Sequence, residues 1–518
     1  MKRILPLALC SICCAIAATI DAQVTATSYR LSDQQQLWHQ TRNAAGMTFD
    51  FAATDSSANR GTAYFDYHHV DGDYHRIQDG GMQNNLRFFT ERYQKIGRYL
   101  YGYGAFDFNM GRTKQRAWSD VMRSYDADPF ISGSSVYGKY DHQDFTLDAS
   151  LSTIPLGRFT YGASLHYEVG DLSRLRDPRS RINLLDYRIT PSITFDMGMG
   201  HRLGAALHYE RRKEKLTGLT TIQTDPNLKY YVMTGLEQAT GTIGGYQGYM
   251  REYVNHEFGG ELSYGFQGTA FHNVTAITLD HGTEYIYGTN KYEPGRYYTY
   301  SYGLSTQNRL HRGKLLHSWD AAVNYEQAYA DEYRQERISE TDGQTGYTSV
   351  HWQTTMEYRK RYQMKQLQLT AHYRLTMTDG QRQQGYVGIR YALNNISNKR
   401  LLPVSKLDHG GSDITLEGGV SLWGHRLMVD AEAGYHAAKK TDLVLADATT
   451  DFATAVLLPD VTILDANFFR GRLQLEYQHP IPIKSRQTQW FARCYGQYVG
   501  AQRSLHRSTV GVSIGLYY

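Results

Sequence analysis

The sequence predicts an all-β fold: a single antiparallel transmembrane β-barrel of about 18 strands, with about 16 to 20 strands compatible with the pattern. Three observations lead to this fold class. They are a leader-like first segment, many segments in which apolar and polar residues alternate, and an alternating final segment that ends on an aromatic residue. Successive side chains of a strand point to opposite faces, so each alternating segment has one apolar face. In lipid every backbone polar group needs a partner, and strands meet this need by closing into a ring.

Residues 1–22 have the pattern of a secretory signal peptide. Lys2 and Arg3 supply the positive start, an apolar stretch runs from Ile4 to Ile20, and we expect cleavage after Ala22. Three of the four cysteines lie in this segment, so the exported chain would keep only Cys494. An internal disulfide is therefore excluded for the exported chain.

Tyrosine is the compositional outlier, with 43 residues against 18 Phe and 6 Trp. Its apolar ring and polar hydroxyl suit the two interfacial belts of a barrel in a membrane. The mean hydropathy is −0.54, and no later segment reaches the roughly 18 apolar residues of a spanning helix. The formal net charge of +4 gives no reason to expect nucleic-acid binding. A tyrosine-rich soluble β-sandwich is the alternative, since soluble sheets also alternate.

The alternating segments give the strands in order, and the connections between them also alternate in length. The clearest segments are 158–169, 202–210, 366–377, 426–435 and 472–477. Tight turns are expected at 95–98, 153–156, 197–201, 266–270 and 423–425, and longer polar connections at 71–82, 120–142, 170–186, 213–255, 395–412 and 438–461. Short turns on one side and long loops on the other are typical of outer-membrane barrels. The segments suggest about nineteen strands, and because bacterial barrels use even numbers we expect eighteen, over residues 60–518.

The final strand has an apolar face that we expect to meet lipid and to form the barrel-assembly signal. Its opposite face is small or polar, from Thr509 to Tyr517. The apolar set is Val510, Val512, Ile514, Leu516 and Tyr518.

Residues 23–59 precede the first strand and read differently. Leu37 and Trp38 are apolar anchors in a short helix-like stretch, and Asn43 to Gly46 is rich in small residues. This segment is a candidate plug of the lumen, and a plain periplasmic lead-in is the alternative.

The polar faces of the strands should line the lumen, because the apolar faces must meet lipid. The interior would then carry both signs of charge, either as ion pairs that stabilise the wall or as a polar path that tunes passage. The predicted lumen-lining residues are Arg158, His166, Glu168, Arg202, His208, Glu210, Glu261, Glu326, His372, Arg374, Arg390, Asp430, Glu432, Arg472 and Glu476.

No catalytic, cofactor or metal site is predicted. His68 and His69 are adjacent, so they point to opposite faces of a strand and cannot chelate one ion from it. Ser164 and His166 share a face, but same-face neighbours lie about 6–7 Å apart, which is too far for a direct pair. Tyrosines between 285 and 302 could stack on a ligand, but the upper aromatic belt is the favoured explanation.

Three stretches resemble the tyrosine-rich outer-membrane β-barrel proteins of Bacteroidota: Ile20–Gln23, Leu37–Gly46 and Gly511–Tyr518. The resemblance implies location in the outer membrane and a role beside TonB-dependent receptors or surface lipoproteins. We expect transport or binding of a nutrient, with a partly occluded lumen. A non-catalytic scaffold of an uptake or assembly complex is the alternative, and an outer-membrane hydrolase is the less favoured one. Lipids and the barrel assembly machinery are the other expected partners.

Overall fold

A computed structural model of the protein describes residue 45 and residues 60–124, 128–222, 227–341, 343–346, 348–379, 382–483 and 486–518. The predicted signal peptide and the candidate plug residues Leu37, Trp38, Asn43 and Gly46 lie outside these residues, so both remain predictions.

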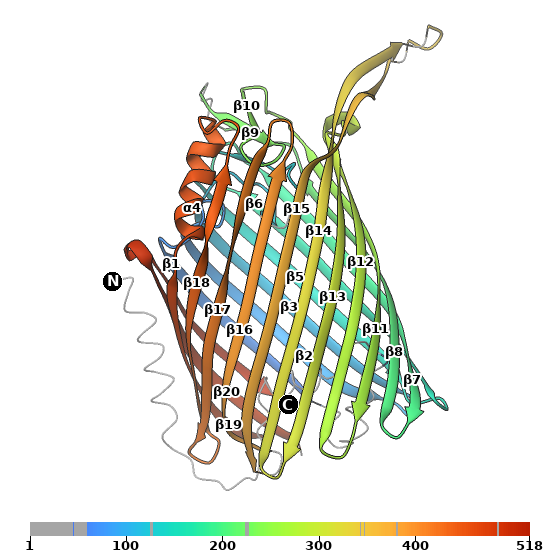
Figure 1. Cartoon of the computed structure of the whole chain (residues 1–518), viewed down its shortest axis with the longest axis vertical. Coiled ribbons are helices and arrows are strands. Elements are labelled where there is room, and N and C mark those ends of the chain that lie inside the picture. The colour runs from blue at the N-terminus through green and yellow to red at the C-terminus, as the bar shows by residue number, and fades with distance from the viewer. Residues whose placement is uncertain are drawn as a thin grey trace.

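Eighteen of the described strands form one closed antiparallel barrel (Figure 1). The ring closes where β1 pairs with both β2 and β21. Elsewhere each barrel strand pairs with the next barrel strand in the chain. The predicted fold class and strand number are confirmed. The barrel strands are β1 (Arg60–Gly72), β2 (Met82–Ile96), β3 (Leu100–Arg116), β5 (Gly138–Thr153), β6 (Phe159–Arg174), β7 (Arg181–Gly198), β8 (His201–Leu216), β11 (Arg251–Gln267), β12 (Phe271–Tyr287), β13 (Gly295–Arg312), β14 (Leu315–Thr341), β15 (Thr348–Asp379), β16 (Arg382–Arg400), β17 (Ser405–Leu422), β18 (Leu427–Val444), β19 (Phe468–Ile483), β20 (Arg486–Ala501) and β21 (His506–Tyr517).

The two ends of the barrel differ. All five predicted tight turns fall at one end, here called the short-turn end, which lies at the bottom of Figure 1. The long connections lie at the other end, the long-loop end. All six are shorter than predicted, most of all 170–186 and 395–412, because β6 continues to Arg174 and β16 continues to Arg400. Near these strand ends the inward-facing residues are polar, so the sequence there looks like that of a loop.

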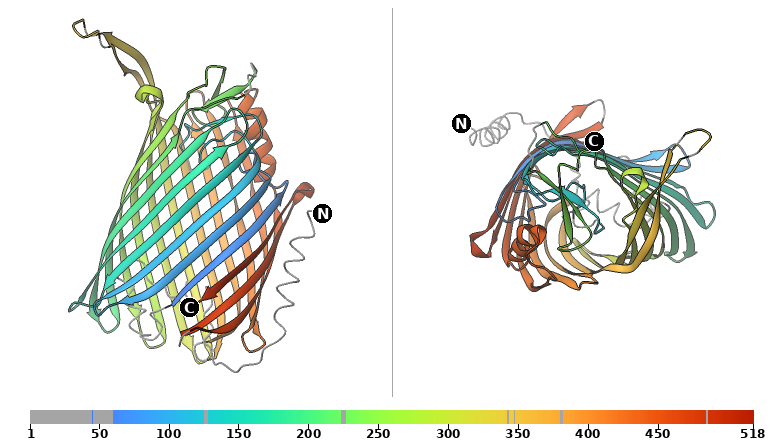
Figure 2. Two further views of the ribbon diagram at one scale, coloured as in Figure 1. Left: turned by 180° about the vertical axis from the view of Figure 1, so that it is seen from behind. Right: turned by 90° about the horizontal axis from the view of Figure 1, so that it is seen from above.

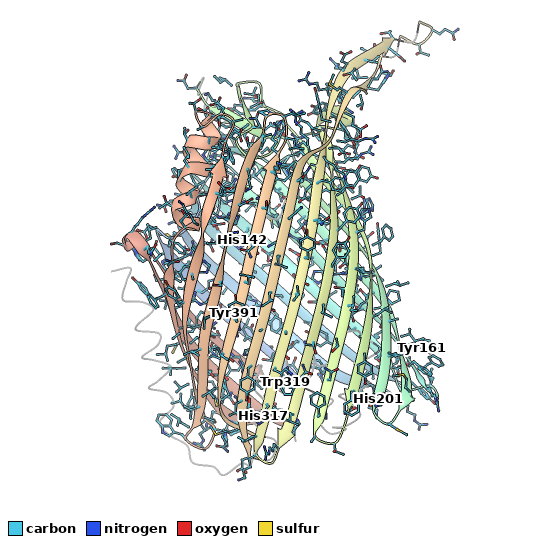
Figure 3. All side chains as sticks on the ribbon, in the orientation of Figure 1. His142, Tyr161, His201, His317, Trp319 and Tyr391 are labelled. Carbon is cyan, nitrogen blue, oxygen red and sulfur yellow. The ribbon has the colours of Figure 1, made fainter. Side chains whose placement is uncertain are left out.

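A belt of aromatic contacts runs along the outer surface near the short-turn end. His201 on β8 contacts Phe266 on β11 with ring centroids 4.8 Å apart, and Phe266 contacts Phe271 on β12 at 6.2 Å. Phe271 stacks on Trp319 of β14 at 5.8 Å. Figure 3 labels His201, Trp319 and Tyr161 in this lower part of the barrel. Such belts mark the interface zones of barrels in membranes.

Three connections at the long-loop end fold over the lumen and form the roof (Figure 2, right). The β3–β5 and β8–β11 connections join in a small sheet of β4 (Ser132–Ser134), β9 (Lys229–Met233) and β10 (Ala239–Ile243). The β18–β19 connection contributes a π-helical turn, η5 (Ala453–Leu457), that runs into α4 (Leu458–Leu464).

An apolar core holds the roof against the barrel wall. Trp118 packs on Tyr231 at 4.4 Å and on Phe452 at 5.5 Å, so all three roof connections meet in one cluster. Wall residues such as Tyr297 and Leu407 belong to the same cluster. Burial of the apolar surface of this cluster holds the roof in the mouth of the lumen.

The β14–β15 hairpin extends past the rest of the barrel as an arm (Figure 1). Gly295 of β13 pairs with Glu332, and Arg400 of β16 pairs with Tyr362. Between those positions β14 and β15 pair only with each other, and two register shifts lie near the base of the arm. Short 3-10 turns complete the described elements, η4 (Thr289–Lys291) and η6 (Gln502–Ser504). No helix among the described residues is both long and apolar enough to cross a membrane.

Candidate functional site in the barrel lumen

The alternation of faces places the predicted lumen residues inside the barrel. On β8 Leu207 is 70% exposed and points outward, whereas its neighbour His208 is 8% exposed and points inward. The same alternation holds along the other predicted segments, with one exception. Arg158 lies exposed in the turn between β5 and β6, at the rim of the short-turn end, because β6 begins at Phe159.

The final strand has the predicted facing. Val510, Ile514 and Leu516 are exposed on the outer surface, with Val512 on the same face. Ser513 points inward and donates a hydrogen bond of 2.6 Å to Asp66. Tyr518 is bonded through its backbone to Gly61 at the start of β1, so the last residue takes part in closing the ring.

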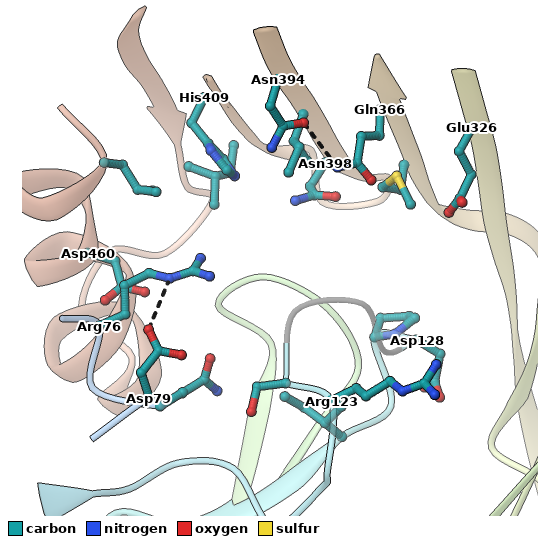
Figure 4. A pocket seen from close by; sticks show the side chains of 18 of the residues that line it. Arg76, Asp79, Arg123, Asp128, Glu326, Gln366, Asn394, Asn398, His409 and Asp460 are labelled. Carbon is teal, nitrogen blue, oxygen red and sulfur yellow. Dashed lines mark hydrogen bonds and ion pairs between the residues drawn. The ribbon is translucent and has the colours of Figure 1, made fainter. Parts of the chain in front are cut away.

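A chamber of about 900 Å³ lies in the lumen between the roof and the wall (Figure 4). The amides of Gln366, Asn394 and Asn398 cover one side, and Gln366 donates a 3.0 Å hydrogen bond to Asn394. Among the described residues that line it are eight carboxylates and only four arginines, with no lysine. The chamber is therefore polar, with more acidic than basic side chains.

Roof and wall carboxylates face this chamber together. Asp460 of α4 accepts a hydrogen bond from the Ile77 backbone N–H and lies near Arg76 and Asp79 (Figure 4). Burial of the carboxyl raises the pKa of Asp460 to about 7, against the opposing effect of Arg76. Asp128 is also buried, and its burial beside the Glu284 carboxylate raises its pKa well above the usual range. These roof groups were not predicted, because nothing in a loop sequence shows which carboxyls will be buried.

Tyrosines of the β8–β11 connection are part of the roof. Tyr230, Tyr231 and Tyr246 are each at most 5% exposed. Tyr231 donates to Asp451 and Tyr230 donates a 3.1 Å hydrogen bond to Ser132. The β8–β11 connection, given as a polar loop by the sequence, thus packs inward on these buried tyrosines.

One ion cluster below the chamber is balanced by cations. Glu417 on β17 is 2% exposed and accepts hydrogen bonds from Arg374 at 2.7 Å and from Arg390 at 3.0 Å; it also pairs with His372 at 2.8 Å. Gly388 on β16 lies between Arg374 and Glu417 in the strand register. The Glu417 side chain crosses over this glycine, since a β-carbon there would come within 2.8 Å of its carboxylate.

A second cluster has the same layout and the opposite balance. His208 on β8 hydrogen-bonds Asp280 on β12, and both are register partners of Gly259 on the strand between them. Glu257 and Glu210 lie beside this pair, and Arg188 on β7 is the cation closest to all three carboxylates. The sequence predicted the inward facing of His208 and Glu210, but only the register brings Asp280 and Glu257 to them.

The other predicted lumen residues are held in smaller contacts. His166 bonds Asp148 at 2.7 Å, and Arg123 of the roof lies 3.8 Å from Glu168. Asp430 accepts from Tyr386, Glu476 from Arg493, and Glu432 is the register partner of Arg472. The remaining three lie at separate places in the wall. Arg202 lies 3.9 Å from Asp196, Glu326 lies in the chamber wall and accepts a hydrogen bond from Ser301, and Glu261 is buried on β11.

Ala45 is the described residue of the N-terminal segment, and it lies against the inner wall. Its backbone N–H donates to Ser192 Oγ at 3.1 Å, and its carbonyl accepts from Ser152 Oγ at 3.4 Å. Ser152 is one residue from the short-turn end of β5, and Ala45 is 1% exposed.

The closed barrel with an apolar exterior, aromatic belt and polar lumen defines the architectural class of outer-membrane β-barrel proteins. The chain belongs to the family described as "Family of unknown function (DUF6850)", whose model matches residues 44–518. A comparison with curated proteins found no match.

Matches among solved structures include three bacterial proteins. The FrpB iron transporter from Neisseria meningitidis (F3-3 variant) has 9% identity and a TM-score of 0.41, and the match covers 90% of this chain and 82% of that one. The copper transporter OprC has 8% identity and a TM-score of 0.38, with 88% and 82% covered. The outer membrane protein OpdK from Pseudomonas aeruginosa has 8% identity and a TM-score of 0.35, with 89% and 99% covered.

Proposed function

We propose that this protein is an outer-membrane barrel that binds a small polar nutrient in the roofed chamber and passes it across the membrane. The observation that carries the proposal is the chamber itself, a polar cavity between a folded roof and a transmembrane-type wall. Concave sites with a few convergent polar groups are the usual form of small-molecule sites. A wall built only for stability would not need a roof with its own apolar core.

The charge of the chamber limits the solute. Eight carboxylates against four arginines favour a neutral or positively charged solute over an anion. The paired amides of Gln366 and Asn394 can donate and accept hydrogen bonds from the same solute.

We further propose that the N-terminal segment closes the short-turn end of the lumen. The contacts of Ala45 with Ser152 and Ser192 support this, because they lie inside the wall at that end. With the roof at the other end, the resting lumen would have no wide path.

Planar-bilayer recording tests the proposal. We expect little basal conductance from the intact exported chain and a clear increase after deletion of residues 23–50. Reversal potentials in a salt gradient should show cation preference, reduced by Glu326→Gln in the chamber and unchanged by Glu340→Gln on the exposed arm. A large, steady, unselective conductance from the intact chain would contradict both the chamber and the plug.

A scaffold role in an uptake or assembly complex is the second candidate, and the arm favours it. Residues 333–361 contain a two-stranded hairpin with exposed edges, and an isolated hairpin is only marginally stable in water. A TonB-dependent receptor or a surface lipoprotein is the kind of partner we propose. Loss of a co-purifying envelope protein on shortening the arm, with conductance unchanged, would support this role.

A further inference from the structure

Three potential metal ligands converge in the middle of the barrel wall. His208, Glu257 and Asp280 come from the adjacent strands β8, β11 and β12, and one ligand atom from each lies within 4.8 Å of the others. Gly259 makes this approach possible. It is the register partner of both His208 and Asp280, and a β-carbon there would clash with the ends of both side chains.

The cluster brings together more carboxyl groups than nearby cations. Glu210, Glu257 and Asp280 share Arg188, whose guanidinium nitrogens lie 3.9, 4.0 and 3.6 Å from them, beyond hydrogen-bond distance. Glu210 and Glu257 are direct register partners, and like charges opposite each other destabilise a strand pair. A bound cation would remove this repulsion.

The donor set selects the kind of cation. One imidazole nitrogen with two carboxylates suits zinc and similar divalent transition metals, whereas magnesium and calcium prefer oxygen ligands alone. Ligand atoms around a tetrahedral zinc lie about 3.4 Å apart, so small side-chain rotations close the observed spacing. We infer that this cluster binds a divalent transition-metal cation through His208, Glu257 and Asp280, with Glu210 adjacent.

Two other lumen clusters show what sets this one apart. His166 and Asp148 form a similar pair at 2.7 Å, but they do not belong to any three-ligand group found among the described residues. His372 pairs with Glu417, where two arginines already occupy the place of a cation. The inference does not depend on which solute the chamber transports.

Zinc binding to the chelator-treated full exported chain in detergent, purified without a histidine tag, tests the inference. We expect one zinc per chain at this site, measured by equilibrium dialysis and elemental analysis. His208→Ala should weaken binding at least about tenfold. Gly259→Ala should weaken it similarly, because the new β-carbon parts His208 from Asp280 while every ligand remains. Arg188→Gln should tighten binding by removing the competing cation.

His166→Ala is the matched control, and it should leave zinc binding unchanged. X-ray absorption of the zinc-loaded protein should show nitrogen and oxygen ligands with no sulfur. Heat-modifiable migration of each variant confirms that its barrel is folded; if His208→Ala does not fold, Gly259→Ala and Arg188→Gln still decide the matter. Absence of zinc binding, or equal affinity in the intact protein, Gly259→Ala and Arg188→Gln, would overturn the inference. Because the readout is zinc rather than conductance, this outcome would leave the proposed function standing.

Discussion

Two clusters in the lumen are each built over a glycine in the middle of three strands, and their charge balance is opposite. Around Gly388 a single buried carboxylate, Glu417, is held by two arginines and a histidine. Around Gly259 three carboxylates share Arg188. In both, a glycine in the middle strand lets side chains from the two flanking strands meet over it.

The difference separates a structural cluster from a candidate binding cluster. The glycine only allows the side chains of the two flanking strands to meet. The charge of the cluster depends on which residues stand at those flanking positions. The Glu417 cluster is complete within the chain, so its removal should cost stability. The His208 cluster has unneutralised charge, so its alteration should affect binding more than stability.

The largest expected effect comes from Glu417→Gln, which keeps the size of the side chain and removes its charge. Two arginines would lose their counter-charge, and we expect the free energy of unfolding to fall by about 3 kcal/mol. This is the lower end of the range for breaking a buried ion pair, because Arg390 is partly exposed. Denaturant unfolding in detergent measures it, with Glu336→Gln on the exposed arm as control. A loss below about 0.5 kcal/mol would mean that this cluster is not structural.

Alanine at the two glycines sharpens the comparison. A β-carbon at Gly388 would lie 2.9 Å from the Tyr373 backbone oxygen, which cannot move aside, so Gly388→Ala should cost about 1–3 kcal/mol. At Gly259 the closest atoms are the ends of two flexible side chains, so Gly259→Ala should cost less than Gly388→Ala. The same unfolding assay compares them. A greater loss for Gly259→Ala would reverse the roles assigned to the two clusters.

The roof offers a pH test of whether ionisation of a buried carboxyl, that of Asp460, weakens its packing. The folded-state pKa of Asp460, about 7, lies above its usual value of 3.8, so the folded roof retains the proton that the opened state releases. Its stabilising contribution is complete below about pH 4 and is lost as pH rises to about 7. Amide exchange in α4, corrected for intrinsic rates, should therefore be faster at pH 8 than at pH 5.

Two variants of the same loop check this effect. Asp460→Asn should abolish the pH dependence. Asp447→Asn should not alter it, because hydrogen bonds from Thr449 lower the pKa of Asp447, away from this pH range. Equal pH dependence in the intact protein and Asp460→Asn would assign the effect to another group.

The smallest effect is expected from His166→Ala. The His166–Asp148 pair is about 40% exposed on both sides, and exposed pairs contribute little. We expect less than about 0.5 kcal/mol in the unfolding assay. A loss as large as that of Glu417→Gln would show that every ion pair of the lumen is structural and would end the contrast between the clusters.

The strand number followed from about nineteen alternating segments only with the rule that bacterial barrels use even numbers. The sequence by itself determined the fold class and the facing of nearly every predicted lumen residue. These depend on the alternation of side chains along one strand, which is local, and on the demand that the apolar face meet lipid. The same local signal placed Ile514 outward and Ser513 inward, and it located five of the short turns. It misplaced the limits of loops such as 170–186, because inward polar residues near a strand end look like loop.

Only the tertiary structure decided which inward residues meet. His208, Glu257 and Asp280 are far apart in the chain, and their contact depends on the register of three strands and on a glycine in the middle one. The roof was equally hidden, since Trp118, Tyr231 and Phe452 come from three connections without periodicity. Strand facing is set by neighbours one or two residues away, whereas register and loop packing are set by contacts between distant segments, which no local pattern encodes.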